Sequence, residues 1–189
     1  MKNCKLLEPY NDIDWNSLIE SLGEPEQIHQ PGTTDWPQWE AMEADGNEMS
    51  VVFKNWRDAN FNMGAINWCN YYPGTGFSGE LTSKLATYLG LNGVHRSWIS
   101  RLDPGTMAPW HFDGEDKVGK WLEKGTPRRF VCTISKPTHG HIFYLGKEEQ
   151  DYFIASPQGT LFEWNYFREW HSGINAGLTP KYQFHLIGY

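Results

Sequence analysis

Two histidines and one aspartate in the second half of the chain have the residue types and order of a metal site. His111 and Asp113 are one residue apart, and positions i and i+2 of a β-strand project to the same side, so imidazole and carboxylate can converge. His171 follows 60 residues after His111, in another β-rich run. Two imidazoles and one carboxylate form the facial triad of non-haem Fe(II) sites, which leaves three adjacent coordination positions open. A structural zinc site would instead be closed by four ligands, usually with cysteine among them.

The H-x-D pair alone is weak evidence, because a chain with seven histidines can contain it by chance. The distal His171 is what makes the pair informative. The other histidines have no fixed spacing to a carboxylate, and we expect them to pack or to form hydrogen bonds. They are His29, His95, His139, His141 and His185.

A lysine beyond the distal histidine fits the same interpretation. A chelating 2-oxo acid can occupy two of the open iron positions and O2 the third, and the distal carboxylate of such an acid needs a buried cation. Lys181 lies ten residues after His171, across the turn AGLTP, so the next strand is expected to bring it back beside that histidine. A lysine in a C-terminal strand is otherwise often a solvated edge charge, so this role depends on the iron site.

The elements expected to position these residues divide the chain into two parts. After Gly93, short β-rich runs alternate with turn signals such as DPGT, PTHG and PQG, which is typical of a barrel or jelly roll. The first half has two stretches with apolar residues at helical spacing. We therefore expect a mainly β fold with helices, in which an α-containing layer covers one sheet. The expected elements of the first half are helices over 14–22 and 77–91, a short strand over 49–55 and a loop over 30–46.

Composition narrows the class of protein. A chain of 189 residues with 39% hydrophobic and 21% charged residues fits one globular domain, 1–189, with a support layer over 1–93 and a β core over 94–189. A net charge of −7 without a basic cluster argues against nucleic acid as a partner. Three scattered cysteines and the lack of a long apolar run predict a cytoplasmic protein that uses no membrane. The oligomeric state is not predicted.

An ordered set of motifs resembles a known family. The stretches SRLDPGTMAPWHFD, RRFVCTIS, GHIFYLG, GTLFEWNYFREWHSGINAG and PKYQF are similar in type and order to 2-oxoglutarate/Fe(II) oxygenases of the aspartyl/asparaginyl β-hydroxylase type. The bacterial free-proline hydroxylases belong to the same broad group. The resemblance covers roughly residues 97–187, and its specificity lies in the order of the parts, because no single part is specific.

The resemblance implies a double-stranded β-helix (jelly roll, cupin-like) and a dioxygenase that uses Fe(II), 2-oxoglutarate and O2. It implies that His111, Asp113 and His171 bind iron and that Lys181 binds the C5 carboxylate of 2-oxoglutarate. Arg129 matches a basic residue lining the cosubstrate or substrate pocket. Two departures are that family members commonly have Arg at the Lys181 position, and that some lack the acidic ligand that Asp113 supplies.

For several residues the sequence is compatible with more than one role. Asn175 is expected to bind within the cosubstrate site or else to satisfy a turn. Arg101, ahead of the PGT turn, could meet a substrate carboxylate. The aromatic stretch 163–170 could line the site or cap the barrel, and Trp110 is expected to pack beside the first ligand. The small size of the chain favours a small molecule, a free amino acid or a peptide side chain as substrate.

Two alternatives come from other classes of protein. One is a non-catalytic, cupin-like jelly roll that binds a metal or another ligand, and failure to bind 2-oxoglutarate beside an Fe(II) surrogate would favour it. The other is a metal-independent interaction domain in which the aromatic stretch between Trp164 and Trp170 binds a partner. A His171 side chain turned away from His111 would favour that alternative.

Overall fold

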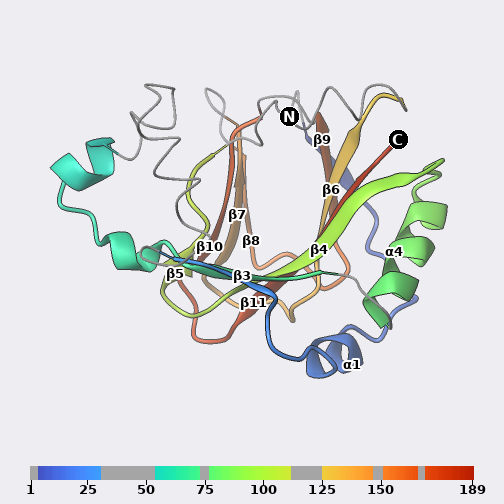
Figure 1. The fold of residues 1–189 in the computed structure, drawn as a ribbon, viewed down its shortest axis with the longest axis horizontal. Coiled ribbons are helices and arrows are strands. Elements are labelled where there is room, and N and C mark those ends of the chain that lie inside the picture. Colours follow the sequence, from blue (N-terminus) through green and yellow to red (C-terminus); the bar gives the residue numbers. More distant parts are fainter. Residues whose placement is uncertain (1–3, 31–53, 73–76, 112–124, 147–150, 166–168) are drawn as a thin grey trace.

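Two antiparallel β-sheets face each other, and the helices α1 and α4 lie on the outer side of one of them (Figure 1). The structure is a computed structural model that describes residues 4–30, 54–72, 77–111, 125–146, 151–165 and 169–189. The mainly antiparallel arrangement with few helices is the double-stranded β-helix that the sequence predicts, so the predicted fold class is confirmed.

The larger sheet has seven strands in the order β1-β9-β6-β11-β4-β3-β2. Its centre is the C-terminal strand β11, which pairs with β4 on one side and β6 on the other. The N-terminal strand β1 lies at one edge of this sheet, beside β9. The bounds are β1 Cys4–Leu7, β2 Gln27–His29, β3 Trp68–Tyr71, β4 Val94–Leu102, β6 Arg128–Thr133, β9 Leu161–Asn165 and β11 Lys181–Gly188.

The smaller sheet has four strands in the order β5-β10-β7-β8. Strand β10 begins at His171 and pairs along its length with β7. The chain just after β5 returns to β10, where His111 and His171 form an isolated antiparallel bridge. The bounds are β5 Thr106–Met107, β7 His141–Leu145, β8 Asp151–Ile154 and β10 His171–Asn175.

Two amphipathic helices cover the outer face of the larger sheet. Helix α1 spans Trp15–Glu20 and is capped by Asp14, whose side chain accepts a hydrogen bond from the Ser17 amide. Helix α4 spans Phe77–Tyr88, and Leu81 and Leu85 form its buried stripe. The outward-facing residues of the sheet pack beneath both helices, among them Ile99, Phe130, Cys132, Phe184 and Leu186.

Side chains alternate along each strand, so every second residue of the larger sheet lies on its inner face, toward the smaller sheet. One apolar cluster joins Val131, Phe162 and Trp164 of the larger sheet to Phe143 and Leu145 of the smaller one, so these positions define the inner face. In β11, Phe184 and Leu186 pack under the helices, and the alternate positions Lys181, Gln183 and His185 project inward instead.

The structure differs from the sequence predictions in the first half. Both predicted helices form, at Trp15–Glu20 and Phe77–Tyr88. The strand expected over 49–55 is not borne out where it is described, because residues 54–58 form a helical segment. The first half also supplies β1, β2 and β3 to the larger sheet, where cross-strand pairing, a long-range interaction, determines their conformation. The loop expected over 30–46 lies outside the described residues, apart from Gln30.

A 3-10 turn, η1 at Met63–Ala65, follows the helical segment 54–58 and precedes β3. None of the helices in the described part of the chain is long and apolar enough to span a bilayer.

Candidate metal and cosubstrate site

His111 and His171 lie side by side at the start of β10. Their backbones exchange two hydrogen bonds, His111 N to His171 O at 3.0 Å and His171 N to His111 O at 2.7 Å. The centroids of the two imidazole rings are 4.3 Å apart. The structure therefore brings together two of the three predicted iron ligands, which are 60 residues apart in the sequence.

Both imidazoles are held in one tautomer by backbone carbonyls. His111 Nδ1 lies 2.5 Å from Pro109 O, and His171 Nδ1 lies 3.0 Å from Glu169 O. A carbonyl oxygen only accepts, so each Nδ1 carries the hydrogen and each Nε2 of the neutral ring carries the lone pair. Metal-binding histidines in proteins are commonly oriented by such a hydrogen bond from the other ring nitrogen. The donor set thus fits a divalent metal.

The predicted third ligand, Asp113, and its neighbour Phe112 lie outside the described residues. Among the residues that are described, no three His, Cys, Asp or Glu side chains come together in a metal-binding group. The carboxylate of the triad therefore remains a prediction from the H-x-D spacing.

Lys181 is buried at the start of β11, with 2% of its surface exposed. Its Nζ donates a hydrogen bond to the backbone oxygen of Ile142 on the smaller sheet. Burial lowers the pKa of the Lys181 ammonium to about 7, and no carboxylate contributes to this shift. Since an ammonium has three hydrogens to donate, the one acceptor found in the described chain leaves capacity for an anion.

Three other residues surround the end of this lysine. Gly173 of β10 faces it, and a Cβ there would lie 3.5 Å from Lys181 Nζ and 3.2 Å from Gln183 Oε1. Gln183 Nε2 is buried without a hydrogen-bond partner among the described residues. His141 donates from Nε2 to Thr179 O at 2.9 Å, and burial, more than the nearby Lys181 charge, lowers its pKa. These groups form a buried, cationic, hydrogen-bonding environment two residues along β10 from His171.

Arg129 projects from β6 onto the inner face and is 1% exposed. Its Cζ lies 4.4 Å from the ring centroid of Trp98 and 5.4 Å from that of Trp164. The Trp164 ring in turn lies 5.4 Å from that of His171. The structure therefore places Arg129 on the same inner face as Lys181, with Trp164 between it and the histidine.

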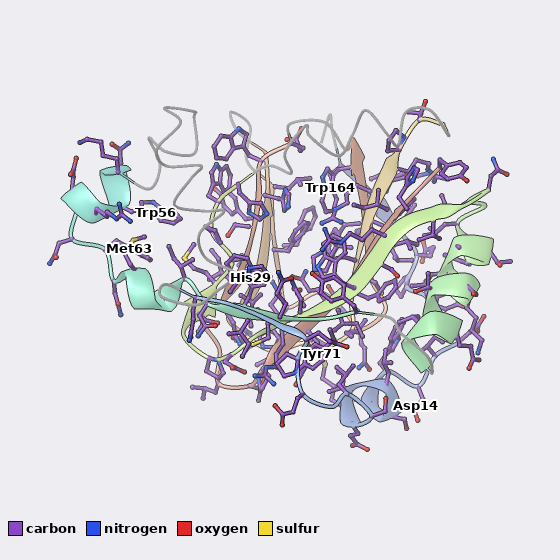
Figure 2. The ribbon with its side chains drawn as sticks, viewed as in Figure 1. Asp14, His29, Trp56, Met63, Tyr71 and Trp164 are labelled. Carbon is purple, nitrogen blue, oxygen red and sulfur yellow. The ribbon has the colours of Figure 1, made fainter. Side chains whose placement is uncertain are left out.

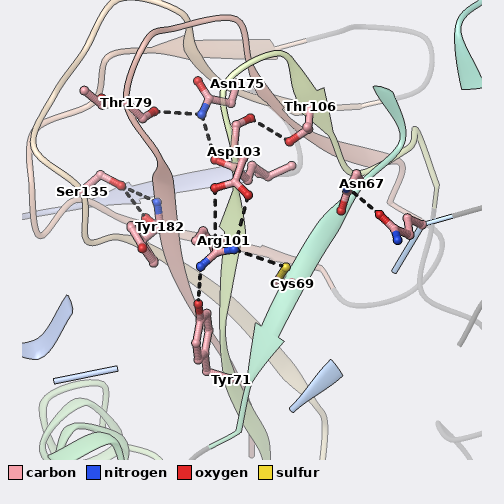
Figure 3. Close-up of polar contacts among 12 residues, drawn as sticks. Asn67, Cys69, Tyr71, Arg101, Asp103, Thr106, Ser135, Asn175, Thr179 and Tyr182 are labelled. Atoms are coloured by element: carbon pink, nitrogen blue, oxygen red, sulfur yellow. Dashed lines mark hydrogen bonds and ion pairs between the residues drawn. The ribbon is translucent and has the colours of Figure 1, made fainter. Parts of the chain in front are cut away.

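Asn175 holds the turn between β10 and β11. Its amide nitrogen donates to Leu102 O at 2.8 Å and to Thr179 O at 2.9 Å (Figure 3). Its Oδ1 accepts from Gly177 N at 3.0 Å. Every polar atom of this fully buried side chain is used by the backbone. Of the two roles that the sequence left open, these contacts support the turn, and Asn175 is not retained as a cosubstrate ligand.

Arg101 lies on the opposite, outer face of β4. Its guanidinium donates to Tyr71 Oη at 2.8 Å and forms an ion pair with Asp103, with Nε 3.2 Å from Oδ1 (Figure 3). The Tyr71 side chain is packed among residues that lie beneath the helices. The expectation that Arg101 meets a substrate carboxylate beside the iron is therefore wrong, because strand alternation turns odd-numbered β4 positions away from the inner face.

The aromatic stretch before His171 divides between two environments. Trp164 lies between the two sheets (Figure 2), and its ring flanks that of His171, whereas Trp170 packs in a cluster with Trp68 and Leu102. Trp110, expected to pack beside the first ligand, contacts the Trp170 ring at 6.0 Å. Residues 166–168 of the stretch are outside the described part.

Sequence reasoning missed three inward-facing residues, Arg96, Trp98 and Gln183, whereas His185 stacks on Trp98 and forms a hydrogen bond with Ser100, as expected for a packing histidine. The signal was present in the strands that contain them. In KYQFHLIG, polar residues occupy alternate positions and apolar residues the positions between, which is the pattern of a strand with one polar inner face. Only the sheet pairing shows that this face looks toward His171.

Comparisons with known proteins identify the fold. No protein-family model matches the chain, and no curated protein sequence matches it. A prolyl hydroxylase from Trichoplax adhaerens, solved with a hypoxia inducible factor peptide fragment, matches with a TM-score of 0.51 and 11% identity, over 93% of this chain and 88% of that chain.

Two further solved structures match at lower TM-scores. A Pseudomonas putida prolyl-4-hydroxylase gives 0.48 at 13% identity, over 65% of this chain and 67% of that chain. A viral collagen prolyl hydroxylase from Paramecium Bursaria Chlorella virus-1, in its 2-oxoglutarate complex, gives 0.45 at 13% identity, over 87% and 96%. The chain thus has a double-stranded β-helix fold, and it shares this fold with the Trichoplax prolyl hydroxylase.

Proposed function

We propose that the protein is an Fe(II)- and 2-oxoglutarate-dependent dioxygenase that hydroxylates a small molecule, a free amino acid or a peptide side chain. The observation that carries the proposal is the joint placement of His111, His171 and Lys181. Two imidazoles with fixed tautomers lie at the start of β10, and a buried ammonium faces Gly173 two residues further along the same strand.

The distances suit a short dicarboxylate. Consecutive inward-facing residues of a strand are about 7 Å apart, and the terminal carbons of a five-carbon diacid are roughly 5 Å apart. A 2-oxo acid held at His171 can therefore place its far carboxylate near the Gly173 position, where Lys181 Nζ and Gln183 lie. Gly173 has no side chain to occupy that position.

Each residue has a distinct role in the proposed reaction. His111 and His171, with Asp113 as the predicted third ligand, would hold Fe(II). Bound iron and 2-oxoglutarate supply the activation of O2, with succinate and CO2 as co-products. Lys181 fixes the C5 carboxylate as a charge-assisted donor, and the Gln183 amide is placed to donate a second hydrogen bond. Trp164 shields one side of His171 from water.

The partners and location follow from the proposed reaction and the composition. The substrate is a small molecule or a peptide side chain. We retain the prediction that the protein is cytoplasmic, and we propose no nucleic acid or membrane partner.

Calorimetric titration of 2-oxoglutarate into the protein with Mn(II) as a redox-inert surrogate tests the proposal. We expect micromolar binding that requires Mn(II), together with succinate release when Fe(II), O2 and candidate substrates replace Mn(II). His171→Ala and Asp113→Ala should each lose Mn(II) and cosubstrate binding, whereas His139→Ala, at a histidine in an exposed turn, should retain both.

Two results would contradict the proposal. If the protein bound Mn(II) but failed to bind 2-oxoglutarate, the alternative of a non-catalytic, cupin-like binding protein would be favoured. Unchanged metal affinity in both His111→Ala and His171→Ala would remove the metal site itself. Circular dichroism of each variant, compared with that of His139→Ala, separates loss of a ligand from loss of the fold.

A further inference from the structure

A row of neutral polar side chains crosses the inner face of the larger sheet. Asn70 of β3 pairs with Ser100 of β4, and Ser100 pairs in turn with Gln183 of β11. All three residues are buried, and Gln183 faces Gly173 in the proposed cosubstrate site. Because neighbouring strands are about 4.8 Å apart, Asn70 lies about 10 Å along this row from Gln183. A molecule that lies beside a bound 2-oxo acid can therefore reach Asn70.

The side chain of Asn70 projects toward the smaller sheet. The preceding residue, Cys69, lies on the outer face, where its Sγ accepts from Arg101 Nη2 at 3.8 Å. Trp68 packs in a cluster with Trp170, the residue just before β10 of the smaller sheet. Since side chains alternate along a strand, Asn70 shares the inner face with Trp68.

The orientation of the Asn70 amide follows from a chain of hydrogen bonds that starts at an arginine. Arg96 Nη2 donates to Tyr72 Oη at 2.8 Å, and a guanidinium only donates. The Tyr72 hydroxyl therefore donates its own hydrogen to Gln27 Oε1. Because Gln27 Oε1 accepts, the Asn70 atom that lies 3.4 Å from it is the nitrogen, Nδ2. The same nitrogen lies 3.0 Å from His29 Nε2, which accepts as well.

The carbonyl oxygen of Asn70 is left as a buried acceptor. The amide nitrogen makes both contacts described above, and Oδ1 has no hydrogen-bond partner among the described residues. A buried polar atom without a partner costs free energy, so native proteins supply such atoms with a water or a ligand group. 2-Oxoglutarate cannot satisfy this oxygen, because its two carboxylates and its ketone only accept. Asn70 therefore requires a donor from another molecule.

Ser100 supplies the complementary group beside this acceptor. Arg129 Nη2 donates to His185 Nδ1 at 3.3 Å, so the other nitrogen of the neutral ring, Nε2, donates to Ser100 Oγ at 2.7 Å. The Ser100 hydroxyl thus keeps its own hydrogen for an acceptor. Residues directly opposite each other in an antiparallel pair have Cβ atoms about 5 Å apart, so one small polar group can bind Asn70 and Ser100 together.

The surroundings favour an uncharged group at this place. The inward-facing positions of β3, β4 and β11, all of which are described, include the cations Arg96 and Lys181 and no Asp or Glu. An ammonium would meet like charges there without a carboxylate to compensate. A carboxylate has no hydrogen to donate to Asn70. An amide or a hydroxyl, in contrast, both donates and accepts.

We propose that the substrate of the dioxygenase presents an uncharged amide or hydroxyl group to this row, which donates to Asn70 Oδ1 and accepts from Ser100 Oγ. The inference rests on the proposed function and narrows its substrate class, since carboxylic acids and amines without such a group fall outside it. Asn70 and Ser100 determine the specificity. Tyr72 and Gln27 are positioning residues, because they act through Asn70.

Matched ligands test the donor requirement on the protein loaded with Mn(II) and 2-oxoglutarate. The probes are primary amides and primary alcohols of three to six carbons and the N-acetyl amides of the amino acids, each beside the counterpart in which methyl groups replace the donor hydrogens. Carboxylates and amines of the same chain lengths form a third arm. We expect at least one amide or alcohol to raise the melting temperature, and its methylated counterpart to bind at least tenfold more weakly. The amide and alcohol arms distinguish the two groups.

Variants assign the donor requirement to Asn70. Asn70→Leu should weaken the apparent affinity for the effective probe at least tenfold, while the 2-oxoglutarate affinity changes less than twofold. Asn16→Leu, at an exposed asparagine of α1, is the matched control and should change neither affinity.

Tyr72→Phe tests the orientation of the amide and keeps the inference testable if Asn70→Leu does not fold. The variant lacks the hydroxyl that fixes Gln27, so the amides of Gln27 and Asn70 can turn over. We expect the preference for the effective probe over its methylated counterpart to fall at least threefold, while the affinity for the counterpart stays the same. A purely structural role of Tyr72 would weaken both ligands alike.

Each contrary result overturns the inference separately from the proposed function. Methylated counterparts as effective as the probes, or a response confined to carboxylates or amines, would overturn it. No stabilisation by any amide or alcohol would leave Asn70 as the site of a bound water only, and an unchanged preference in both Asn70→Leu and Tyr72→Phe would remove the assigned residues. Binding of Mn(II) and 2-oxoglutarate to the wild-type protein is measured first, and its failure would instead overturn the proposed function.

Discussion

At the scale of single residues, Lys181 combines deep burial with a positive charge. Its Nζ has one backbone acceptor in the described chain, and removing an ammonium from water costs several kcal/mol unless other groups compensate. The same property that penalises the unliganded protein favours an incoming carboxylate. Lys181 therefore contributes unfavourably to the free energy of folding and favourably to the free energy of carboxylate binding.

Lys181→Met should separate these two effects. We expect the variant to bind Mn(II) normally, to lose about 2–5 kcal/mol of 2-oxoglutarate binding, and to unfold at equal or higher denaturant concentration than the wild type without ligand. Calorimetry and urea unfolding measure the two quantities. Lys84→Met is the control: Lys84 is an exposed helix residue paired with Glu80, and it should affect neither by more than about 1 kcal/mol.

The affinity for 2-oxoglutarate should fall as pH rises above about 7. Because burial places the pKa of Lys181 at about 7, the lysine is neutral above that pH and must take up a proton when the carboxylate binds. The dissociation constant should then rise by up to about tenfold per pH unit between pH 7 and 9. Titrations in buffers of different ionisation enthalpy would detect the proton uptake. A flat profile, or the same slope in Lys181→Met, would contradict the assignment.

The same pKa determines how the stability of the unliganded protein changes with pH. An unfolded lysine titrates near 10.5, so between about pH 7 and 10.5 the unfolded chain binds the extra proton. The contribution of Lys181 to stability is therefore unfavourable below about pH 7 and becomes less unfavourable as pH rises through that window.

At the scale of elements, β10 supplies a proposed metal ligand, a glycine and a turn residue in sequence. His171, Gly173 and Asn175 share its inner face, since they alternate along the strand. Each position has a separate requirement: an imidazole, no side chain, and an amide that bonds to the backbone. This arrangement lets single substitutions test the site and the turn independently.

Gly173→Ala should impair cosubstrate binding more than folding. The new Cβ would lie 3.1 Å from Leu102 Cδ1, 3.2 Å from Gln183 Oε1 and 3.5 Å from Lys181 Nζ, all side-chain atoms that can shift. We expect at least a tenfold loss of 2-oxoglutarate affinity and a change in unfolding free energy within about 1.5 kcal/mol. Gly140→Ala is the contrast, because its φ of +90° and a contact of 2.4 Å with the Ala176 backbone should destabilise the fold strongly.

Asn175→Ala should destabilise the β10–β11 turn. The variant loses three hydrogen bonds to backbone groups and leaves those groups unsatisfied, which should reduce the unfolding free energy by roughly 3 kcal/mol. Urea unfolding measures the loss. If the stable fraction of the variant bound 2-oxoglutarate far more weakly than the wild type, the cosubstrate role for Asn175 would have to be reinstated.

At the scale of the whole molecule, the two faces of the larger sheet do different work. The outer face packs apolar residues under α1 and α4, whereas the inner face carries Lys181 and Arg129 and is turned toward the smaller sheet, which holds His171. The residues that stabilise the fold under the helices and the residues of the proposed site thus lie on opposite faces of the same sheet.

Leu85→Ala should test this separation. Leu85 is 1% exposed in α4 against the outer face, and truncation of such a leucine costs about 2–5 kcal/mol of unfolding free energy. The 2-oxoglutarate affinity of the folded variant, measured below its melting temperature, should remain within twofold of the wild type. A parallel loss of both quantities would show that the helix layer supports the site.

Much of the second half could be predicted from sequence, because strand alternation and turn residues are local signals. The sequence predicted the β-rich character of the chain after Gly93, where β4, β6, β7, β9, β10 and β11 lie, and it also predicted the fold class. The candidate ligands His111 and His171 could also be selected, since the H-x-D spacing and the distal histidine are visible without a structure. Asp113 and the iron itself remain predictions.

The tertiary structure decided which side of each strand faces the site. Arg101 and Arg129 look equivalent in the sequence, yet Arg101 points outward to Tyr71 and Arg129 inward to Trp98. A shift of one residue reverses the face of every side chain in a strand, and the face is set by long-range pairing and by the helices above it. The sequence by itself therefore determined the residue types and their spacing, including the His111 and His171 pair. Only the packed sheets decided that Lys181 is buried opposite Gly173, that Asn175 serves the turn, and that Arg96 joins Arg129 around Trp98.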